Sequence, residues 1–213
     1  MRCKEKLEMR LRYDAETDAY DDLYSEEQRI KYDLALHHIA LSCENRILDC
    51  GCGTGIFLEK VADNLRIVVG VDLSPKMLRK AKDRLRNSNV HLLCADFDFL
   101  PFPRTSFRYV FIFTALPAPR YWGDSIREML RVLESDGTIT LSVQKKGIST
   151  EQLSKKLSMN GLEPRVLVDD QTTRDYLIIM KKGGMRYARN KFPYETDRAV
   201  TRRTTFRLRR RES

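Results

Sequence analysis

The chain has 213 residues, of which 42% are hydrophobic, and it carries a formal net charge of +9. This length and composition fit one domain with a buried core and exclude global disorder. The longest charge-free apolar run, residues 109–119, is about half of the roughly 20 residues that a membrane span needs. Because the first residues also lack the apolar stretch of a signal peptide, we expect a cytoplasmic protein without a membrane span.

The basic charge is concentrated near one end of the sequence. Residues 1–182 hold 29 basic and 27 acidic side chains, whereas residues 183–213 hold 10 basic and 3 acidic ones. We therefore expect one folded domain over residues 1–182 and a basic, flexible C-terminal tail over residues 183–213.

The cysteines form an odd set without a repeating spacing: Cys3, Cys43, Cys50, Cys52 and Cys94. This pattern favours reduced thiols in a cytosol over a disulfide framework. Cys50 and Cys52 have no nearby histidine or cysteine to complete a zinc site, so no metal is expected.

Helical and extended patterns follow one another along the chain. Apolar residues at helical spacing predict an amphipathic helix over residues 26–41. Ser74 is the expected N-cap of a helix that has Pro75 at its first position, and Asn160-Gly161 is a C-cap signal. The other expected helices run from the glycine-rich turn to about residue 64 and over residues 75–86, 121–133 and 149–159, and the strands over residues 46–49, 67–71, 90–94, 109–113, 137–143, 163–168 and 176–180.

Strand and helix alternate between residue 46 and about residue 160, and the strands are almost continuously apolar. This pattern is typical of a parallel sheet that is covered by helices on both faces. Such sheets bind ligands at the carboxyl ends of their strands. The residues just after each apolar run are therefore the candidates for a site.

A glycine-rich segment, Asp49-Cys50-Gly51-Cys52-Gly53-Thr54-Gly55, follows the first predicted strand. Glycines allow a sharp turn and a close approach of a ligand to the backbone, although a plain strand-to-helix turn also explains them. The spacing G-x-G-x-G differs from the dinucleotide fingerprint, which needs a small residue where Ile56 stands. Asp49 would repel a pyrophosphate and suits a ligand with an ammonium or sulfonium group.

Two more acids stand just after predicted strands. Asp72 follows the second strand, where a carboxylate can accept hydrogen bonds from ribose hydroxyls. The alternative role, capping the next helix, is better filled by Ser74. Asp96 follows the third strand and could bond the exocyclic amine of an adenine, with Phe97 near the ring.

These segments together carry a family resemblance. They are Ile47-Leu48-Asp49 with the glycine loop, Val69-Gly70-Val71-Asp72-Leu73-Ser74-Pro75-Lys76-Met77-Leu78, Ala95-Asp96 with Leu100-Pro101-Phe102, and Ser106-Phe107. The region from about residue 13 to residue 181 resembles class I S-adenosylmethionine-dependent methyltransferases, of the type-11/25-like kind. The resemblance implies an α/β fold, a Rossmann-like doubly wound seven-stranded sheet of order 3-2-1-4-5-7-6, with the last strand antiparallel and helices on both faces.

The resemblance also implies roles for individual residues toward S-adenosylmethionine. The Asp49 loop, with Gly51, Cys52, Gly53 and Gly55, would hold the methionine moiety. Asp72 would hold the ribose, and Ala95-Asp96 the adenine. Leu73 and Met77 would pack on the adenosine, and Thr114 would line the methyl-donor pocket.

Tyrosines in the first part of the chain add a candidate lid. Tyr13-Asp14, Tyr20-Asp21 and Tyr24 are similar to a Tyr-Asp segment that many members of the family fold over the cofactor, so residues 1–41 are expected to form an N-terminal helical lid segment. Tyr20 and Tyr24 are candidate substrate contacts. The competing interpretation is that tyrosines along a helix pack on a neighbouring element.

The sequence departs from the family at two positions. Arg108 replaces a usual aspartate at a position that we expect to be structural. Thr114-Ala115-Leu116-Pro117-Ala118 stands where methyltransferases of exocyclic base amines often carry Asn/Asp-Pro-Pro-aromatic, so the motif does not support that reaction. No general base is assigned, since His37, His38 and His91 lie away from the expected pocket; alignment of a nucleophile with a sulfonium methyl can supply much of the rate.

The C-terminal tail combines arginines, including Arg202, Arg203 and Arg207, with aromatic residues. Arginines bind phosphates and aromatics stack on unpaired bases, which favours RNA, ribosomal or transfer, as the methyl acceptor. The alternatives are a small-molecule methyltransferase with an incidental tail, attraction to an acidic membrane surface, and a non-catalytic RNA-binding or ribosome assembly factor. A small activator protein is a further possible partner.

Overall fold

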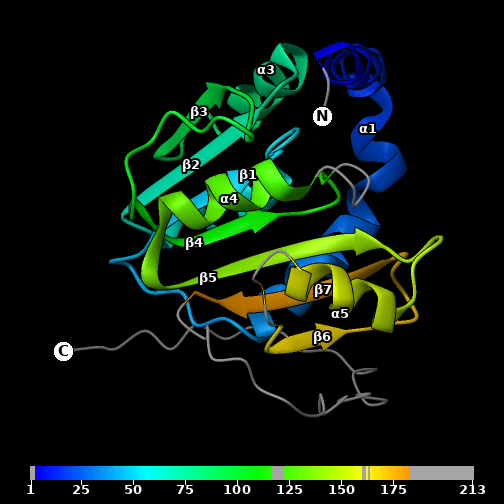
Figure 1. Ribbon diagram of the computed structural model, residues 1–213. Coiled ribbons are helices and arrows are strands. Elements are labelled where there is room, and N and C mark those ends of the chain that lie inside the picture. Colours follow the sequence, from blue (N-terminus) through cyan, green and yellow to red (C-terminus); the bar gives the residue numbers. More distant parts are fainter. Residues whose placement is uncertain (1–2, 117–121, 160–161, 163, 183–213) are drawn as a thin grey trace.

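A seven-stranded sheet forms the centre of the computed structural model, which describes residues 3–116, 122–159, 162 and 164–182 (Figure 1). The strand order is β3-β2-β1-β4-β5-β7-β6, and β7 runs antiparallel to both of its neighbours. The fold predicted from the sequence is therefore confirmed. The strands are β1 (Arg46–Cys50), β2 (Ile67–Asp72), β3 (Val90–Cys94), β4 (Phe107–Ile112), β5 (Leu133–Gln144), β6 (Val166–Val168) and β7 (Asp175–Lys181).

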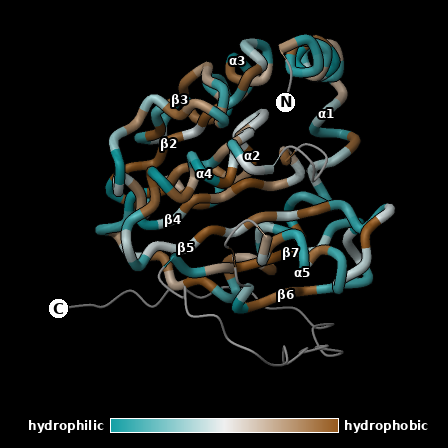
Figure 2. The backbone as a smooth tube through the Cα atoms, in the orientation of Figure 1, coloured by the Kyte–Doolittle hydropathy of each residue, from teal (hydrophilic) through white to brown (hydrophobic). Residues whose placement is uncertain are grey.

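Helices cover both faces of this sheet. Successive residues of a strand point to opposite faces, so Leu48 packs with the helices on one side and Ile47 with those on the other. Figure 2 shows the hydrophobic residues gathered along the strands between these layers. One face carries α4 (Trp122–Val132) and α5 (Thr150–Met159), and the other carries α1 (Cys3–His37), α2 (Ile56–Val61) and α3 (Pro75–Arg84).

Helix α1 begins far earlier than residue 26, where the apolar spacing predicts its start. Its first half lacks an apolar stripe and is stabilised instead by ion pairs one turn apart, such as Arg10 Nε with Asp14 at 3.7 Å and Arg12 Nε with Glu16 at 3.3 Å. Such pairs leave no hydrophobic period in the sequence, so the apolar spacing shows only the second half of the helix, whereas the family resemblance implies helical structure from the first residues.

Strand β6 is shorter than predicted. It begins at Val166, because Pro164 has no backbone N–H to give to the sheet. Arg108, the departure from the family pattern, forms an ion pair with Asp136 in the first part of the neighbouring strand β5, which is a structural contact. Asn160-Gly161, Pro117-Ala118 and the whole C-terminal tail lie outside the described residues.

Helix α1 runs past the carboxyl ends of the central strands (Figure 1). Asp14 accepts a hydrogen bond from Ser74 Oγ at 2.5 Å, and Asp21 accepts one from Thr54 Oγ1 at 2.6 Å. Further along, Lys31 Nζ lies 2.9 Å from Asp175 Oδ2 of β7. These three contacts hold the helix across the edge of the sheet where ligands bind in this architecture.

Candidate functional site

The glycine loop between β1 and α2 is built from backbone conformations that favour glycine. Gly51, Gly53 and Gly55 have φ angles of 76°, 54° and 81°. A Cβ on Gly51 would lie only 2.4 Å from Cβ of Ala115, so any side chain there would collide with the segment after β4. The N–H of Gly51 donates to the carbonyl of Val71 at 2.8 Å, which ties the loop to β2.

Asp72 ends β2 and faces the loop. Its Oδ2 accepts a hydrogen bond from the N–H of Gly53 at 2.9 Å, and its Oδ1 accepts one from the N–H of Ser74 at 2.8 Å. Burial raises the pKa of Asp72, and these two N–H groups oppose that shift. A carboxylate has about four acceptor positions, so Asp72 can still accept hydrogen bonds from a ligand. Ser74 caps α3 through the N–H of Met77, as predicted.

Asp49 is the second buried carboxyl of the site, with 2% of its surface exposed. Burial, together with the nearby charge of Asp72, raises its pKa from 3.8 to about 8. At neutral pH the carboxyl is therefore poised to lose its proton when a cation arrives beside it.

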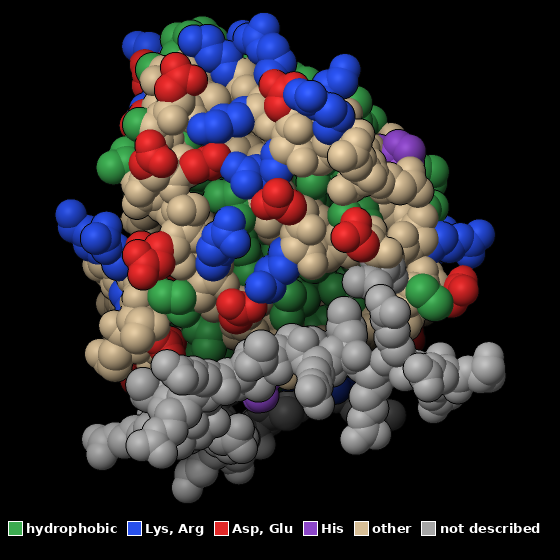
Figure 3. All heavy atoms as spheres, turned by 180° about the vertical axis from the view of Figure 1, so that it is seen from behind, with side chains coloured by type: hydrophobic (Ala, Val, Ile, Leu, Met, Phe, Trp, Pro, Cys, Tyr) green, Lys and Arg blue, Asp and Glu red, His purple; other side chains and the backbone are tan. Residues whose placement is uncertain are grey.

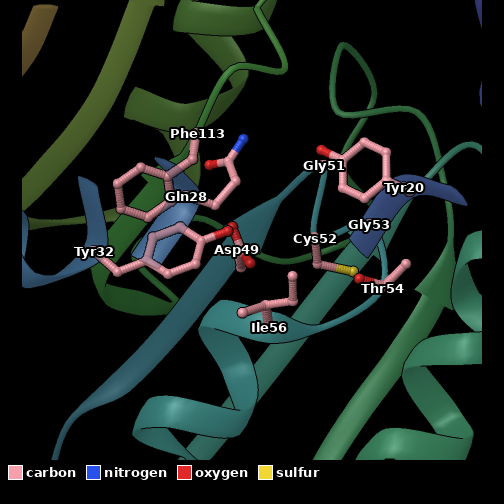
Figure 4. A pocket seen from close by; sticks show the side chains of 10 residues that line it. All are labelled: Tyr20, Gln28, Tyr32, Asp49, Gly51, Cys52, Gly53, Thr54, Ile56 and Phe113. Atoms are coloured by element: carbon pink, nitrogen blue, oxygen red, sulfur yellow. The ribbon is translucent and has the colours of Figure 1, made fainter. Parts of the chain in front are cut away.

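Asp49 lines a first cavity together with residues from α1, the glycine loop and the end of β4. Figure 4 shows the hydroxyl of Tyr32 pointing toward the Asp49 carboxylate and the amide of Gln28 beside Phe113. The walls are more polar than apolar, which suits a charged or hydrogen-bonding ligand group. The lining residues are Tyr20, Gln28, Tyr32, Asp49, Gly51, Cys52, Gly53, Thr54, Ile56 and Phe113.

A second cavity adjoins the first and shares Tyr20, Gly51, Gly53 and Phe113 with it. It is partly open to solvent, so a ligand can enter it from outside. Its walls are mostly apolar, with one acid, which fits a nucleoside. The lining residues are Met9, Arg10, Tyr13, Tyr20, Gly51, Gly53, Asp72, Leu73, Ser74, Met77, Phe97, Phe113, Thr114 and Ala115.

Asp96 and Ala95 do not line either cavity. Lys6 Nζ, from the first turns of α1, forms an ion pair with Asp96 and another with Asp98 Oδ2 at 2.5 Å. The N–H of Asp98 also donates to Asp96 Oδ1 at 3.0 Å. The acid expected at the adenine is therefore bound to α1 in this conformation, and Phe97 is the member of that segment that reaches the cavity.

Thr114 follows β4 and has a φ of 56°, a left-handed conformation that is rare for a threonine. Its Oγ1 donates to Asp175 Oδ2 at 2.8 Å and accepts from Lys31 Nζ at 2.8 Å. Gln28 Nε2 also donates to this oxygen, at 3.2 Å. These hydrogen bonds connect α1, β4 and β7 directly behind the cavities.

The structure brings most of the predicted site residues into the two cavities: Tyr20, Asp49, Gly51, Cys52, Gly53, Asp72, Leu73, Met77, Phe97 and Thr114. Gly55 instead begins α2, and Tyr24 packs against Tyr20 with ring centroids 5.0 Å apart. Arg202, Arg203 and Arg207 lie outside the described residues. The residues that sequence reasoning missed include Met9, Arg10, Gln28, Tyr32 and Phe113, along with Lys6 beside Asp96.

Comparison with known proteins agrees with this geometry. Residues 47–137 match the family model described as a methyltransferase domain. A malonyl-[acyl-carrier protein] O-methyltransferase from Marinomonas sp. is 28% identical over 81% of this chain and 64% of its own length. Residues 47–137 are therefore a methyltransferase domain. The chain spans 64% and 53% of the lengths of the first two curated relatives that it matches.

Solved structures share the methyltransferase fold at low identity. One is the complex of the Trm112 methyltransferase activator of Haloferax volcanii with a methyltransferase, with a TM-score of 0.68, 19% identity, and coverage of 84% of this chain and 99% of that one. Another is a 1,6-didemethyltoxoflavin N1-methyltransferase of Burkholderia thailandensis with bound S-adenosylhomocysteine, with a TM-score of 0.67, 16% identity, and coverage of 82% and 87%. Among the described residues, no helix of this methyltransferase is long and apolar enough to cross a membrane.

S-adenosylmethionine is the methyl donor of this family, and the residues of the site fit its parts. The apolar second cavity, with Asp72 at its edge, suits the adenosine. The first cavity holds the carboxyl of Asp49 and a buried amide oxygen of Gln28 that has no hydrogen-bond partner. Two acceptors of this kind suit the cationic amino-acid end of the donor.

Proposed function

We propose that this methyltransferase transfers the methyl group of S-adenosylmethionine to RNA, ribosomal or transfer. The observation that carries the methyl-transfer part is the pair of adjoining cavities, which combine Asp49 and Asp72 from neighbouring strand ends with the glycine loop. The RNA part is supported by the excess of seven positive charges in residues 183–213, which follows from the 10 basic and 3 acidic side chains there.

The residues of the site would act by binding and orienting. The sulfonium of the donor supplies an activated methyl group, so a strong general base is not required for every acceptor. Asp72 would accept hydrogen bonds from the ribose hydroxyls, while Leu73, Met77 and Phe97 would enclose the adenine. Helix α1, which contributes Tyr13 and Tyr20, would exclude water from the cavity walls.

Substitution of Asp72 tests the donor site. Asp72→Ala is expected to weaken binding of S-adenosylmethionine by about 1.5–3 kcal/mol, because hydrogen bonds to a charged group are lost. Isothermal titration calorimetry measures the affinity, and thermal unfolding shows that the variant is folded. Asp83→Ala, at an exposed carboxylate of α3, is the matched control. Equal affinities of parent and Asp72→Ala would refute the donor assignment.

The acceptor is identified by methyl transfer from labelled donor to total RNA of a strain that lacks this gene. Incorporation into RNA, followed by mass spectrometry of the digested product, names the nucleotide and the methylated atom. Incorporation into small molecules alone would favour the second candidate function, which the names of the Marinomonas and Burkholderia relatives support. Binding of RNA without any turnover would indicate a non-catalytic RNA-binding or assembly factor.

We also propose that a small activator protein is required for full activity. The structural neighbour from Haloferax volcanii is bound to the Trm112 activator and overlaps 84% of this chain. Methyl transfer measured with and without a co-expressed protein of that kind tests the proposal.

The five free cysteines fit a reducing, cytoplasmic location.

A further inference from the structure

Gln28 is a buried polar residue whose amide is only half satisfied. It lies on α1 with 4% of its surface exposed, and its Nε2 donates to Thr114 Oγ1 at 3.2 Å. Its Oε1 is buried without a hydrogen-bond partner. The side chain lines the first cavity, beside Phe113 and above Asp49 in the view of Figure 4.

The neighbouring hydrogen bonds fix which end of this amide faces the cavity. Thr114 has one hydroxyl hydrogen, and it goes to Asp175 Oδ2 at 2.8 Å. The lone pairs of the same hydroxyl accept from Lys31 Nζ and from Gln28 Nε2. With the amide turned over, two oxygens would meet without a hydrogen between them. The network therefore holds the carbonyl oxygen of Gln28 away from Thr114.

A buried acceptor without a donor is destabilising, so a donor from a ligand would compensate for this arrangement. The same cavity contains the carboxyl of Asp49, which is a second acceptor. Lys31, a buried cation on the same helix, already donates to Thr114 and Asp175. Two acceptors in one cavity, one of them ionisable, match a ligand group with several N–H donors and a positive charge.

We propose that Gln28 Oε1 and the Asp49 carboxylate together bind the α-ammonium group of the amino-acid end of S-adenosylmethionine. This inference rests on the proposed donor binding and adds a ligand from α1 to it. Helix α1 is then a direct cofactor contact as well as a cover. The site distinguishes the intact donor from nucleosides that lack the amino-acid end.

The test compares two ligands that differ in this end, S-adenosylhomocysteine and 5′-methylthioadenosine. Gln28→Met keeps the side-chain length and removes the amide oxygen. We expect this variant to bind S-adenosylhomocysteine roughly 10-fold more weakly or worse, because a hydrogen bond to a charged group contributes about that factor to affinity. Affinity for 5′-methylthioadenosine, measured by the same calorimetry, is expected to change less than about 2-fold, because that ligand has no ammonium group. Gln152→Met on the exposed side of α5 is the matched control.

A third ligand makes the test specific to the ammonium group. The analogue of S-adenosylhomocysteine without its α-amino group is expected to bind parent and Gln28→Met equally. Unchanged binding of S-adenosylhomocysteine to Gln28→Met, or equal losses for all three ligands, would overturn the assignment of Gln28. If the parent protein binds none of the three ligands, the proposed donor binding itself fails, which is a different result.

Discussion

Asp49 and Asp72 end neighbouring parallel strands, and their carboxyls therefore share one small region of the site. Asp72 is held by two backbone N–H groups. Asp49 is buried, and its burial together with the charge of Asp72 raises the pKa of its carboxyl to about 8. Two acids with different surroundings thus have different tasks, one fixed in orientation and one able to change its charge with the ligand.

The raised pKa of Asp49 makes folding depend on pH. An unfolded aspartate titrates near 3.8 and the folded one near 8, so the folded chain holds an extra proton between these values. The free energy of unfolding therefore falls as pH rises through this window, by at most about 1.4 kcal/mol per pH unit for one proton. Asp49→Asn removes this titrating group, so we expect the free energy of unfolding of the variant to fall less steeply with pH than that of the parent.

Urea denaturation of parent and Asp49→Asn at pH 5, 6.5 and 8 measures this effect. The two proteins are expected to differ little at pH 5, and Asp49→Asn should be the more stable one at pH 8. Asp83→Asn, at an exposed carboxylate, should follow the parent at all three values. A parallel decline of parent and Asp49→Asn would show that Asp49 is ionised in the folded state across the whole range.

At the scale of elements, α1 is fastened to the sheet by a buried ion pair. Lys31 and Asp175 are each 2% exposed, and Lys31 Nζ lies 2.9 Å from Asp175 Oδ2. The same carboxylate oxygen accepts hydrogen bonds from Thr114 Oγ1 and Ser142 Oγ at 2.8 and 2.9 Å. These bonds offset part of the cost of burying two charges. The positions of Thr114 after β4 and of helix α1 over the site consequently depend on the carboxylate of Asp175.

Removal of one partner of this pair should be costly. Lys31→Met leaves the Asp175 charge buried and is expected to lower the free energy of unfolding by about 3–5 kcal/mol. Adding Asp175→Asn to it removes that charge while keeping an acceptor for the two hydroxyls, so part of the loss should return. Lys4→Met, at a pair with 87% and 65% exposed side chains, should change little. Chemical denaturation compares the free energies of unfolding of all four proteins. A small decrease in Lys31→Met would show that the Lys31–Asp175 pair contributes little to stability.

The elements and the site differ in how far the sequence reveals them. The strands and the acids at their ends follow from local patterns, because an apolar run, its last residue and the glycines after it are adjacent in the chain. The contacts of Gln28 with Thr114 and of Lys6 with Asp96 join residues 86 and 90 positions apart. No local pattern encodes such a pairing. The apolar spacing also does not show the start of α1, since ion pairs rather than an apolar stripe stabilise its first turns.

At the scale of the whole molecule, the charge divides between two parts of the chain. Figure 3 shows Lys and Arg interspersed with Asp and Glu on the face seen from behind Figure 1. This mixture agrees with the 29 basic and 27 acidic side chains of residues 1–182. Residues 1–182 therefore have no large overall attraction for a polyanion, and a long-range electrostatic contribution to RNA binding would come mainly from residues 183–213.

Truncation after Lys182 separates these two contributions. Lys182 Nζ donates to the carbonyls of Leu130 and Leu133, both at 2.6 Å, so a chain that ends there keeps this anchor of the last strand. We expect the truncated protein to unfold at the parent temperature and to bind S-adenosylhomocysteine with the parent affinity. Its affinity for RNA should fall, because arginines that neutralise phosphates are lost.

The salt dependence of RNA binding distinguishes lost phosphate contacts from any other effect of truncation. Each phosphate contact that is removed should reduce the slope of log affinity against log salt concentration by about 0.7–0.9. A full-length variant with Arg202, Arg203 and Arg207 changed to Gln keeps the chain length and should show an intermediate slope. If truncated and full-length proteins bind RNA with the same affinity and the same slope, the tail contributes no phosphate contacts, and the acceptor must then be recognised by the domain of residues 1–182 alone.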